Sequence, residues 1–186
     1  MLSSPKLSPG LGLKPMADPG RETRPPQTGA LVNPPVGFEP TALPDLTVLK
    51  RNIFRDQRGA VLHGLRDFEM EFPVGEVYVS QILPGVVKAW KRHAKMWQRF
   101  VVPHGNVQFV FYDNRKGDGA DAKLVTIEAS PQQPHYQLIT VPPGIWYGFR
   151  AMGSTDALIV NCASMPMTPG ESETLSLDQA PWYQWT

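Results

Sequence analysis

Short runs in which apolar and polar residues alternate dominate the chain from Leu46 onward, and no segment has the period of a long amphipathic helix. Alternation is typical of β-strands, whose successive side chains point to opposite faces of a sheet. Gly, Pro and Asp residues separate the runs. The pattern predicts strands at 76–83, 85–93, 98–102, 106–112, 123–128, 136–141 and 156–163. Short strands at this spacing indicate an all-β sandwich or jelly-roll barrel.

One of these runs is apolar on both faces. Val107, Phe109 and Phe111 share one face, and Val110 and Tyr112 lie on the other. A strand covered on both sides has neighbours above and below, so we expect this one to lie inside a sheet and not at its edge.

The first 44 residues lack this alternation and contain about half of the 20 prolines. Such a segment buries too little apolar surface to offset the entropy lost on ordering. We therefore expect residues 1–44 to form a Pro-rich disordered or surface-draped arm, and residues 45–186 to form the folded domain.

Composition narrows the possible partners and location. The chain of 186 residues is 41% hydrophobic and carries a net charge of +1 without basic runs, which argues against a nucleic-acid partner or an acidic membrane surface. Its single cysteine, Cys162, excludes an intrachain disulfide and favours a reducing compartment. No apolar stretch reaches the roughly 18 residues of a membrane span. We expect a cytoplasmic protein.

The region from Gly85 to Gly105 resembles the first motif of the cupins, and the segment from Pro142 resembles the second. Metal-binding cupins carry a His-x-His pair and a Glu in the first motif and a His in the second. Here those ligand positions are Lys91, His93, Gln98 and Tyr147. One imidazole beside a lysine cation cannot hold a divalent metal, so the sequence predicts a cupin jelly-roll barrel without metal or other cofactor.

Alternation places Ala89, Lys91 and His93 on one side of their strand and Trp90 and Arg92 on the other. In the cupin frame the first side faces the barrel interior. Partial burial lowers the pKa values of lysine and histidine toward the range useful for proton transfer, so this side is a candidate acid/base site.

The order of several motifs is similar to that of the dTDP-4-dehydrorhamnose 3,5-epimerase family, over about residues 46–186. The family's Phe-x-Asp-x-Arg-Gly element is matched from Phe54 to Gly59, and its Gly-Val-Leu-Arg-Gly-Leu-His element from Gly85 to Lys91. A strand from Gln98, an Asp-x-Arg pattern at Asp113, and a Pro-x-Gly-x-x-His-Gly-Phe element from Pro142 to Phe149 follow in order. The resemblance implies a cupin jelly roll that acts on a dTDP-linked sugar as a homodimer, because a strand crosses between subunits in the family.

The resemblance also implies binding residues. An aromatic residue stacks on the thymine and basic groups contact the diphosphate. These roles map to Phe54, Arg58, Lys88, Arg99 and, less directly, Arg115.

At the catalytic positions the chain departs from the family. The family's base falls on Lys91, its catalytic Tyr near Asn161, and its second-motif His on Tyr147. A divergent branch with Gly-Trp-His-x-His-Lys and Asn-Cys-Ala elements is closer to residues 89–93 and 161–163.

We predict an epimerase or isomerase that abstracts a proton next to the keto group of a nucleotide-linked 4-keto-6-deoxysugar. His93 or Lys91 is the base, Lys91 can stabilise the enolate, Tyr147 can return the proton, and Asp178 orients the base. One alternative is a sugar-nucleotide-binding cupin that has lost catalysis. A second is a metal-dependent cupin, which needs His93 to meet His104 and His135.

Overall fold

The computed structural model describes residues 38–66, 72–117 and 119–185, and in them it is all-β apart from one 3₁₀ turn, η2 (Gly119–Asp121). The strands, in chain order, are β1 (Phe38–Pro40), β2 (Thr47–Lys50), β3 (Ile53–Asp56), β4 (Gly59–Leu62), β5 (Glu76–Ile82), β6 (Val87–His93), β7 (Gln98–His104), β8 (Val107–Asp113), β9 (Lys123–Ala129), β10 (Gln137–Val141), β11 (Trp146–Ala151), β12 (Ala157–Ala163) and β13 (Ser172–Thr174). The expected all-β fold is confirmed. No helix in the described part of the chain has the length and apolar character needed to cross a membrane.

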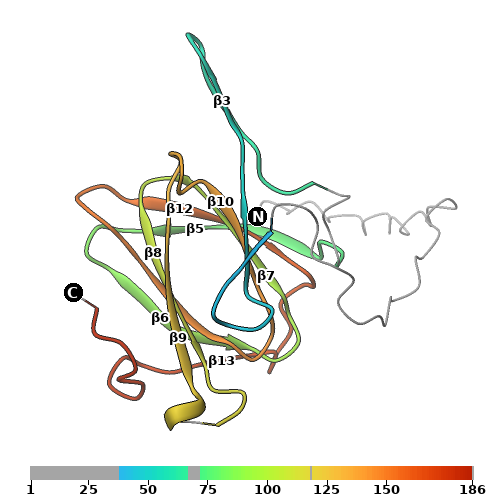
Figure 1. Ribbon diagram of the computed structural model, residues 1–186, viewed down its shortest axis with the longest axis vertical. Helices are drawn as coiled ribbons and strands as arrows, with labels where there is room; N and C mark the ends of the chain where they lie inside the picture. The colour runs from blue at the N-terminus through green and yellow to red at the C-terminus, as the bar shows by residue number, and fades with distance from the viewer. Residues whose placement is uncertain (1–37, 67–71, 118, 186) are drawn as a thin grey trace, which may run out of the picture. The chain divides into compact units, whose positions relative to one another are not determined.

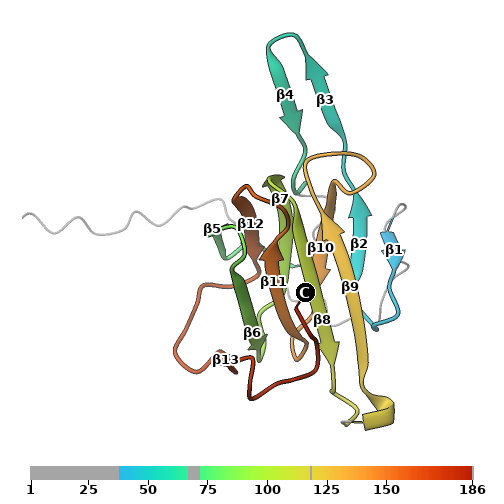
Figure 2. The same ribbon diagram turned by 90° about the vertical axis from the view of Figure 1, so that its left-hand side faces the viewer.

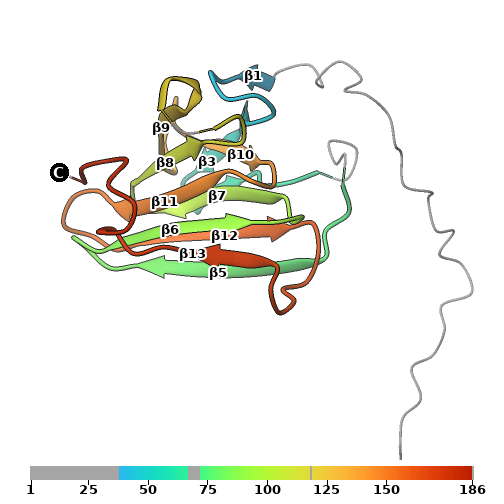
Figure 3. The same ribbon diagram turned by 90° about the horizontal axis from the view of Figure 1, so that it is seen from below.

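Two antiparallel sheets lie face to face, as Figure 3 shows. One has the strand order β1-β2-β10-β7-β12-β5, and the other has the order β13-β6-β11-β8-β9. β8 lies between β11 and β9, so the run that is apolar on both faces is an interior strand, as predicted.

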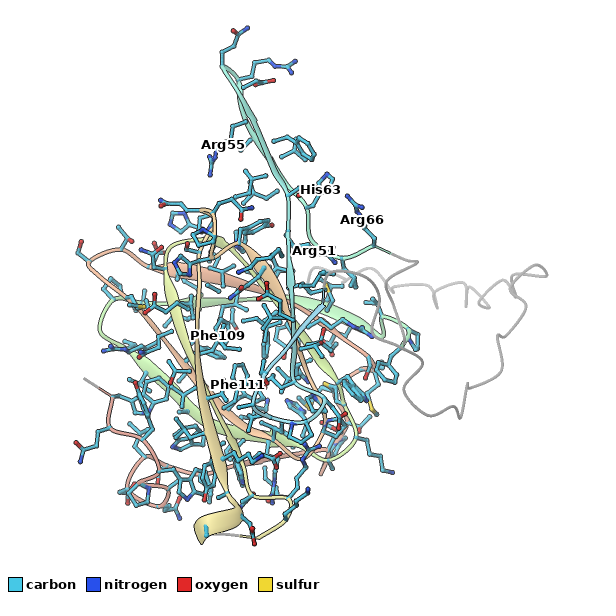
Figure 4. All side chains as sticks on the ribbon, viewed as in Figure 1. Arg51, Arg55, His63, Arg66, Phe109 and Phe111 are labelled. Atoms are coloured by element: carbon cyan, nitrogen blue, oxygen red, sulfur yellow. The ribbon has the colours of Figure 1, made fainter. Side chains whose placement is uncertain are left out.

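The main hydrophobic core fills the space between the sheets. Phe109 and Phe111 point into it from β8 and have no exposed surface (Figure 4). Phe100, on β7 of the other sheet, packs on Phe109 with 5.4 Å between ring centroids. Ile139 and Ile159 close the core from β10 and β12.

The folded unit begins before residue 45. β1 pairs with β2, and Leu43 and Leu46 are buried in the main core. The Thr41 hydroxyl accepts the backbone N–H of Leu43 and donates to the carbonyl of Leu46, which holds this turn against the sheet. The predicted arm is therefore wrong for residues 38–44, and its remainder, 1–37, lies outside the described residues.

The C-terminal segment covers the outer face of the five-stranded sheet. Trp90 projects from β6 into an aromatic cluster with Trp182 and Trp185, and its indole N–H donates to the carbonyl of Ala180 at 3.1 Å. Gly148 lies beneath this cluster, where a Cβ atom would come within 2.3 Å of the Cβ of Ala89. The close approach of β11 and β6 thus explains the glycine.

The β3–β4 hairpin extends beyond the sandwich (Figures 1 and 2). Phe54 and Val61 are cross-strand partners on it, and they are 57% and 61% exposed. Arg55 and His63 also lie on the hairpin (Figure 4). A two-stranded hairpin is marginally stable by itself, and this one leaves two apolar side chains exposed to solvent.

Candidate active site

A cavity of about 300 Å³ opens between the two sheets, beside the main core. It is lined from both sheets, by apolar and by polar side chains. The lining residues are Tyr78, Ser80, Lys88, Ala89, Trp90, Lys91, Phe100, Tyr147, Phe149, Ile159, Asn161 and Thr174. An apolar hollow with a few polar groups converging on it is the usual form of a small-molecule site.

A register shift brings two lysines to this cavity. On β11, Tyr147 lies opposite Lys91 of β6, but Phe149 lies opposite Lys88, which leaves an extra residue on β6 between the two pairs. Strict alternation would turn Lys88 away with Trp90. The shift places both Lys88 and Lys91 on the cavity wall.

His93, two residues beyond Lys91, is buried against a carboxylate that the sequence did not point to. Its Nδ1 lies 2.5 Å from Oε2 of Glu171, and both side chains are at most 3% exposed. The other oxygen of Glu171 accepts the backbone N–H groups of Lys95 and Met96 at 3.0 and 2.8 Å. An ionised carboxylate only accepts, so Nδ1 of His93 carries the hydrogen and Nε2 carries a lone pair.

The free lone pair of His93 faces Tyr147. The hydroxyl of Tyr147 lies 3.1 Å from Nε2, and the two rings stack with 6.0 Å between centroids. Tyr147 lines the cavity, whereas His93 lies behind it. Glu171, His93 and Tyr147 therefore form a hydrogen-bonded line that ends at the cavity wall.

Burial and these contacts set the protonation states of the line. Burial lowers the pKa of His93 below 6.5, although the Glu171 carboxylate acts in the opposite direction. Burial alone would raise the pKa of Glu171, but the hydrogen bonds from His93, Lys95 and Met96 together lower it below 4.5. Burial raises the pKa of Tyr147 well above 10. At neutral pH the line thus holds an ionised carboxylate, a neutral imidazole and a neutral phenol.

Asn161 stands on the opposite wall. Its Oδ1 accepts the backbone N–H of Arg99 at 3.1 Å, and its Nδ2 donates to the hydroxyl of Tyr78 at 2.7 Å and to Oε1 of Gln98. Asn161 is buried and lines the cavity.

Two of the predicted phosphate-binding arginines do not reach the cavity. Arg99 lies on the outer face of its sheet, where its guanidinium donates to the carbonyl of Phe72 at 2.8 Å and lies over that ring. Alternation explains this, because Phe100 next to it points inward. Arg115 is held by Asp113 at 2.9 Å and by the carbonyl of Pro44 at the end of β8. Both side chains are engaged in the fold of their own chain.

Phe54 and Arg58 also lie away from the cavity of their own chain. Both are on the β3–β4 hairpin, where the guanidinium of Arg58 pairs with Asp56 at 2.6 Å. These two residues therefore do not contribute to the cavity of their own chain.

Asp178 does not orient His93. It is exposed, and its carboxylate interacts with Ser176 in the C-terminal segment, which lowers its pKa. Glu171 takes the expected position beside the imidazole. The prediction that Asp178 orients the base is therefore wrong.

The three histidines of the metal-dependent alternative do not converge. His104 is exposed 3.4 Å from Asp156 and His135 is exposed in another loop, whereas His93 is buried between Glu171 and Tyr147. Among the described residues, no group of three or more His, Cys, Asp or Glu side chains is arranged to hold a metal ion.

Known proteins that are similar to this chain include sugar epimerases and isomerases. The chain is 31% identical over 120 residues to the probable low-salt glycan biosynthesis epimerase Agl13 of Haloferax volcanii, a match that covers 63% of this chain and 76% of Agl13. A solved dTDP sugar isomerase from Desulfovibrio desulfuricans is 38% identical and superimposes with a TM-score of 0.70, covering 77% of this chain and 90% of the isomerase. The chain belongs to the dTDP-4-dehydrorhamnose 3,5-epimerase-like family of cupins.

Two further relatives extend the comparison. The spore coat polysaccharide biosynthesis protein SpsL of Bacillus subtilis is 27% identical over 128 residues, which cover 68% of this chain and 82% of SpsL. A dTDP-4-dehydrorhamnose 3,5-epimerase from Sulfolobus tokodaii shares the fold with a TM-score of 0.66 at 23% identity, covering 80% of this chain and 86% of that one. No family model matches the chain.

Proposed function

We propose that this protein is an epimerase or isomerase that abstracts a proton next to the keto group of a nucleotide-linked 4-keto-6-deoxysugar, in polysaccharide or deoxysugar biosynthesis. The hydrogen-bonded line from Glu171 through His93 to Tyr147, ending at a cavity between the sheets, carries this proposal. Membership of a family of sugar epimerases and isomerases supports it.

The hydrogen-bonded line lets Tyr147 accept a proton without first becoming a free phenolate, because His93 takes the phenol proton at the same time. A proton leaves the carbon next to the keto group for the oxygen of Tyr147, while the proton of Tyr147 passes to Nε2 of His93. The electron pair of the broken C–H bond becomes the enolate, and the imidazolium is held beside the carboxylate of Glu171. Delivery of a solvent proton to the other face of the carbon, with the proton on His93 released to solvent, gives an epimer. Delivery of the proton of Tyr147 to the keto carbon, with the proton of the adjacent hydroxyl passing to the former keto oxygen, gives an isomer.

The two lysines are placed to stabilise the negative enolate oxygen and the negative diphosphate. Lys91 lies opposite Tyr147 on the neighbouring strand, so its ammonium group can face the enolate oxygen. Lys88 is exposed at the cavity wall, where its Nζ donates to the carbonyl of Gln81 at 2.5 Å, and can approach a diphosphate. A cavity of about 300 Å³ suits a sugar ring, with the nucleotide outside it.

The nucleotide part of the site requires a second copy of the chain in this proposal. Phe54 and Arg58 lie on the projecting hairpin, and the apolar side chains of Phe54 and Val61 are exposed there. A homodimer in which each hairpin reaches its partner would cover them and bring a ring and a guanidinium to the nucleotide. Light scattering should give the mass of a dimer, and Val61→Asp should give a monomer, whereas Leu124→Asp on β9 should leave the dimer intact. A wild-type monomer would contradict this part of the proposal.

Hydrogen exchange tests the reaction. Incubation of the protein with dTDP-4-keto-6-deoxyglucose in heavy water should place deuterium next to the keto group, detected by proton NMR. His93→Ala should slow this exchange by about 10²-fold or more. If the wild type binds dTDP but does not catalyse exchange, the catalytically degenerate cupin is favoured. If it neither binds dTDP nor catalyses exchange, both functional hypotheses fail and only the fold assignment stands. A cytoplasmic location, which the free Cys162 favours, belongs to this proposal as well.

A further inference from the structure

A second tyrosine faces the same cavity, and its hydrogen bonding is the reverse of that of Tyr147. Tyr78 projects inward from β5 of the six-stranded sheet, and Tyr147 projects inward from β11 of the other. The two hydroxyls therefore meet the cavity from opposite walls.

The direction of the Tyr78 hydrogen bond follows from Asn161. The backbone N–H of Arg99 can only donate, so the atom of Asn161 that meets it is Oδ1 and the amide nitrogen points the other way. That nitrogen has two hydrogens, one for Oε1 of Gln98 and one for the hydroxyl oxygen of Tyr78 at 2.7 Å. The oxygen of Tyr78 is an acceptor in this contact, which leaves its own hydrogen for another partner.

The surroundings of Asn161 keep this direction fixed. Gln98 presents its oxygen to Asn161 although its own Nε2 then has no partner among the described residues. In the same part of the chain, the Tyr78 hydroxyl donates to no protein acceptor. The hydrogen of Tyr78 is thus available to the cavity.

Tyr147 presents the opposite character. Its hydrogen is directed to Nε2 of His93, so its oxygen lone pair is what the cavity meets. One wall therefore offers a hydrogen-bond donor and the other offers an acceptor. Formation of an enolate needs this pair, a donor at the keto oxygen and an acceptor for the proton of the neighbouring carbon.

We infer that Tyr78 is a catalytic residue that donates its hydroxyl hydrogen to the keto oxygen of the sugar and stabilises the enolate, and that Asn161 positions it. This inference rests on the proposed function. Tyr78 and Lys91 then have different roles at the enolate oxygen. Lys91 supplies a positive charge on a flexible side chain, whereas Tyr78 supplies a hydrogen-bond donor that the buried amide of Asn161 holds in place.

The test uses full-length protein with dTDP-4-keto-6-deoxyglucose in heavy water. Tyr78→Phe should lower kcat for exchange by about 10²- to 10³-fold, the range for losing one oxyanion donor, with KM within about threefold of the wild type. Tyr136→Phe, the same chemical change at a buried ring in a different hydrophobic cluster, should stay within twofold. Exchange by Tyr78→Phe within threefold of the wild type would overturn the role of Tyr78 alone, and absence of exchange by the wild type would overturn it together with the proposed function.

Asn161→Asp tests the positioning role. The new carboxylate still accepts from Arg99, and Gln98 can turn its unpaired Nε2 toward it, so the fold has the partners it needs. The carboxylate accepts the hydrogen of Tyr78 and withdraws it from the cavity. The rate should fall about as far as in Tyr78→Phe, and adding Tyr78→Phe should then cost at most about twofold more. A full further loss in the double variant would show that Asn161 acts independently of Tyr78.

Discussion

Glu171→Gln probes the proposed proton path with a change of one atom. In the wild type, one oxygen of Glu171 accepts two backbone N–H groups and the other accepts from Nδ1 of His93. The amide oxygen of glutamine must stay with the backbone donors, because those groups cannot accept. The amide nitrogen then faces Nδ1, and the hydrogen of the imidazole moves to Nε2.

The consequence for catalysis is larger than the consequence for stability. With its hydrogen on Nε2, His93 can no longer accept the proton of Tyr147. Forcing the wrong tautomer on a catalytic histidine costs about 10⁴-fold in kcat in the serine protease triad, so we expect a loss of about 10³- to 10⁴-fold here. The variant loses one charged hydrogen bond, about 1.5–3 kcal/mol, against a typical total stability of about 5–15 kcal/mol, and should remain folded.

Exchange of the substrate proton in heavy water, followed by NMR over a range of pH, measures this effect. Because the carboxylate raises the pKa of His93 against the effect of burial, its removal should lower that pKa further and move the acid limb of the residual activity to lower pH. Glu173→Gln is the matched control, since Glu173 is exposed, pairs with Arg92 at 2.7 Å and should stay within twofold of the wild type. A Glu171→Gln variant with more than one tenth of wild-type activity would refute the proposed path.

Four other predictions follow from the described contacts. The kcat/KM of the wild type should fall at acid pH with a midpoint below 6.5, the ordinary pKa of histidine, because burial lowers the pKa of His93 and only the neutral imidazole accepts a proton; a midpoint above 6.5 would contradict this. Lys91→Met should lower the plateau exchange rate by about 10²-fold and move the acid limb to slightly higher pH, because the Lys91 cation helps to lower the pKa of His93, whereas loss of the acid limb altogether would make Lys91 the base. Phe109→Ala and Phe111→Ala should each cost about 3–5 kcal/mol in urea unfolding, and a loss below about 1 kcal/mol for both would contradict their place in the core. Elemental analysis should find no stoichiometric zinc, iron or manganese, because Lys91, Gln98 and Tyr147 stand at ligand positions of the cupin motifs.

Alternation and motif spacing predicted the fold because each of these patterns lies within one short segment of the sequence. The strand at 107–113 has two apolar faces and lies inside its sheet, and the turn residues separate most of the observed strands. The same alternation fails at β6, where the register shift opposite Tyr147 and Phe149 turns Lys88 toward the cavity. Such an irregularity depends on the partner strand and leaves no pattern in one segment.

The site was predicted in part, for the same reason. His93 and Tyr147 came from motifs and meet in the structure, but Glu171 lies 78 residues from His93 in a loop with no pattern of its own. Glu171 reaches His93 because it directly precedes β13, which pairs with the end of β6, and this pairing is visible only in the structure. Arg99 was assigned from the family motif against its own alternation with Phe100, and alternation proved the better guide.

The proposed reaction gives a physical reason for a lysine at position 91. In a metal-binding cupin that position belongs to a histidine ligand, so Lys91 brings a cationic side chain to a position that in such a barrel binds a metal cation. Transfer of the substrate proton through Tyr147 to His93 creates a positive charge 2.5 Å from the Glu171 carboxylate and a negative charge facing Lys91. Each new charge meets an existing opposite charge, so the proton transfer itself creates no uncompensated ion. In the proposed reaction Glu171 and Lys91 thus stabilise the charges at opposite ends of one proton path, and a lysine at position 91 is compatible with catalysis.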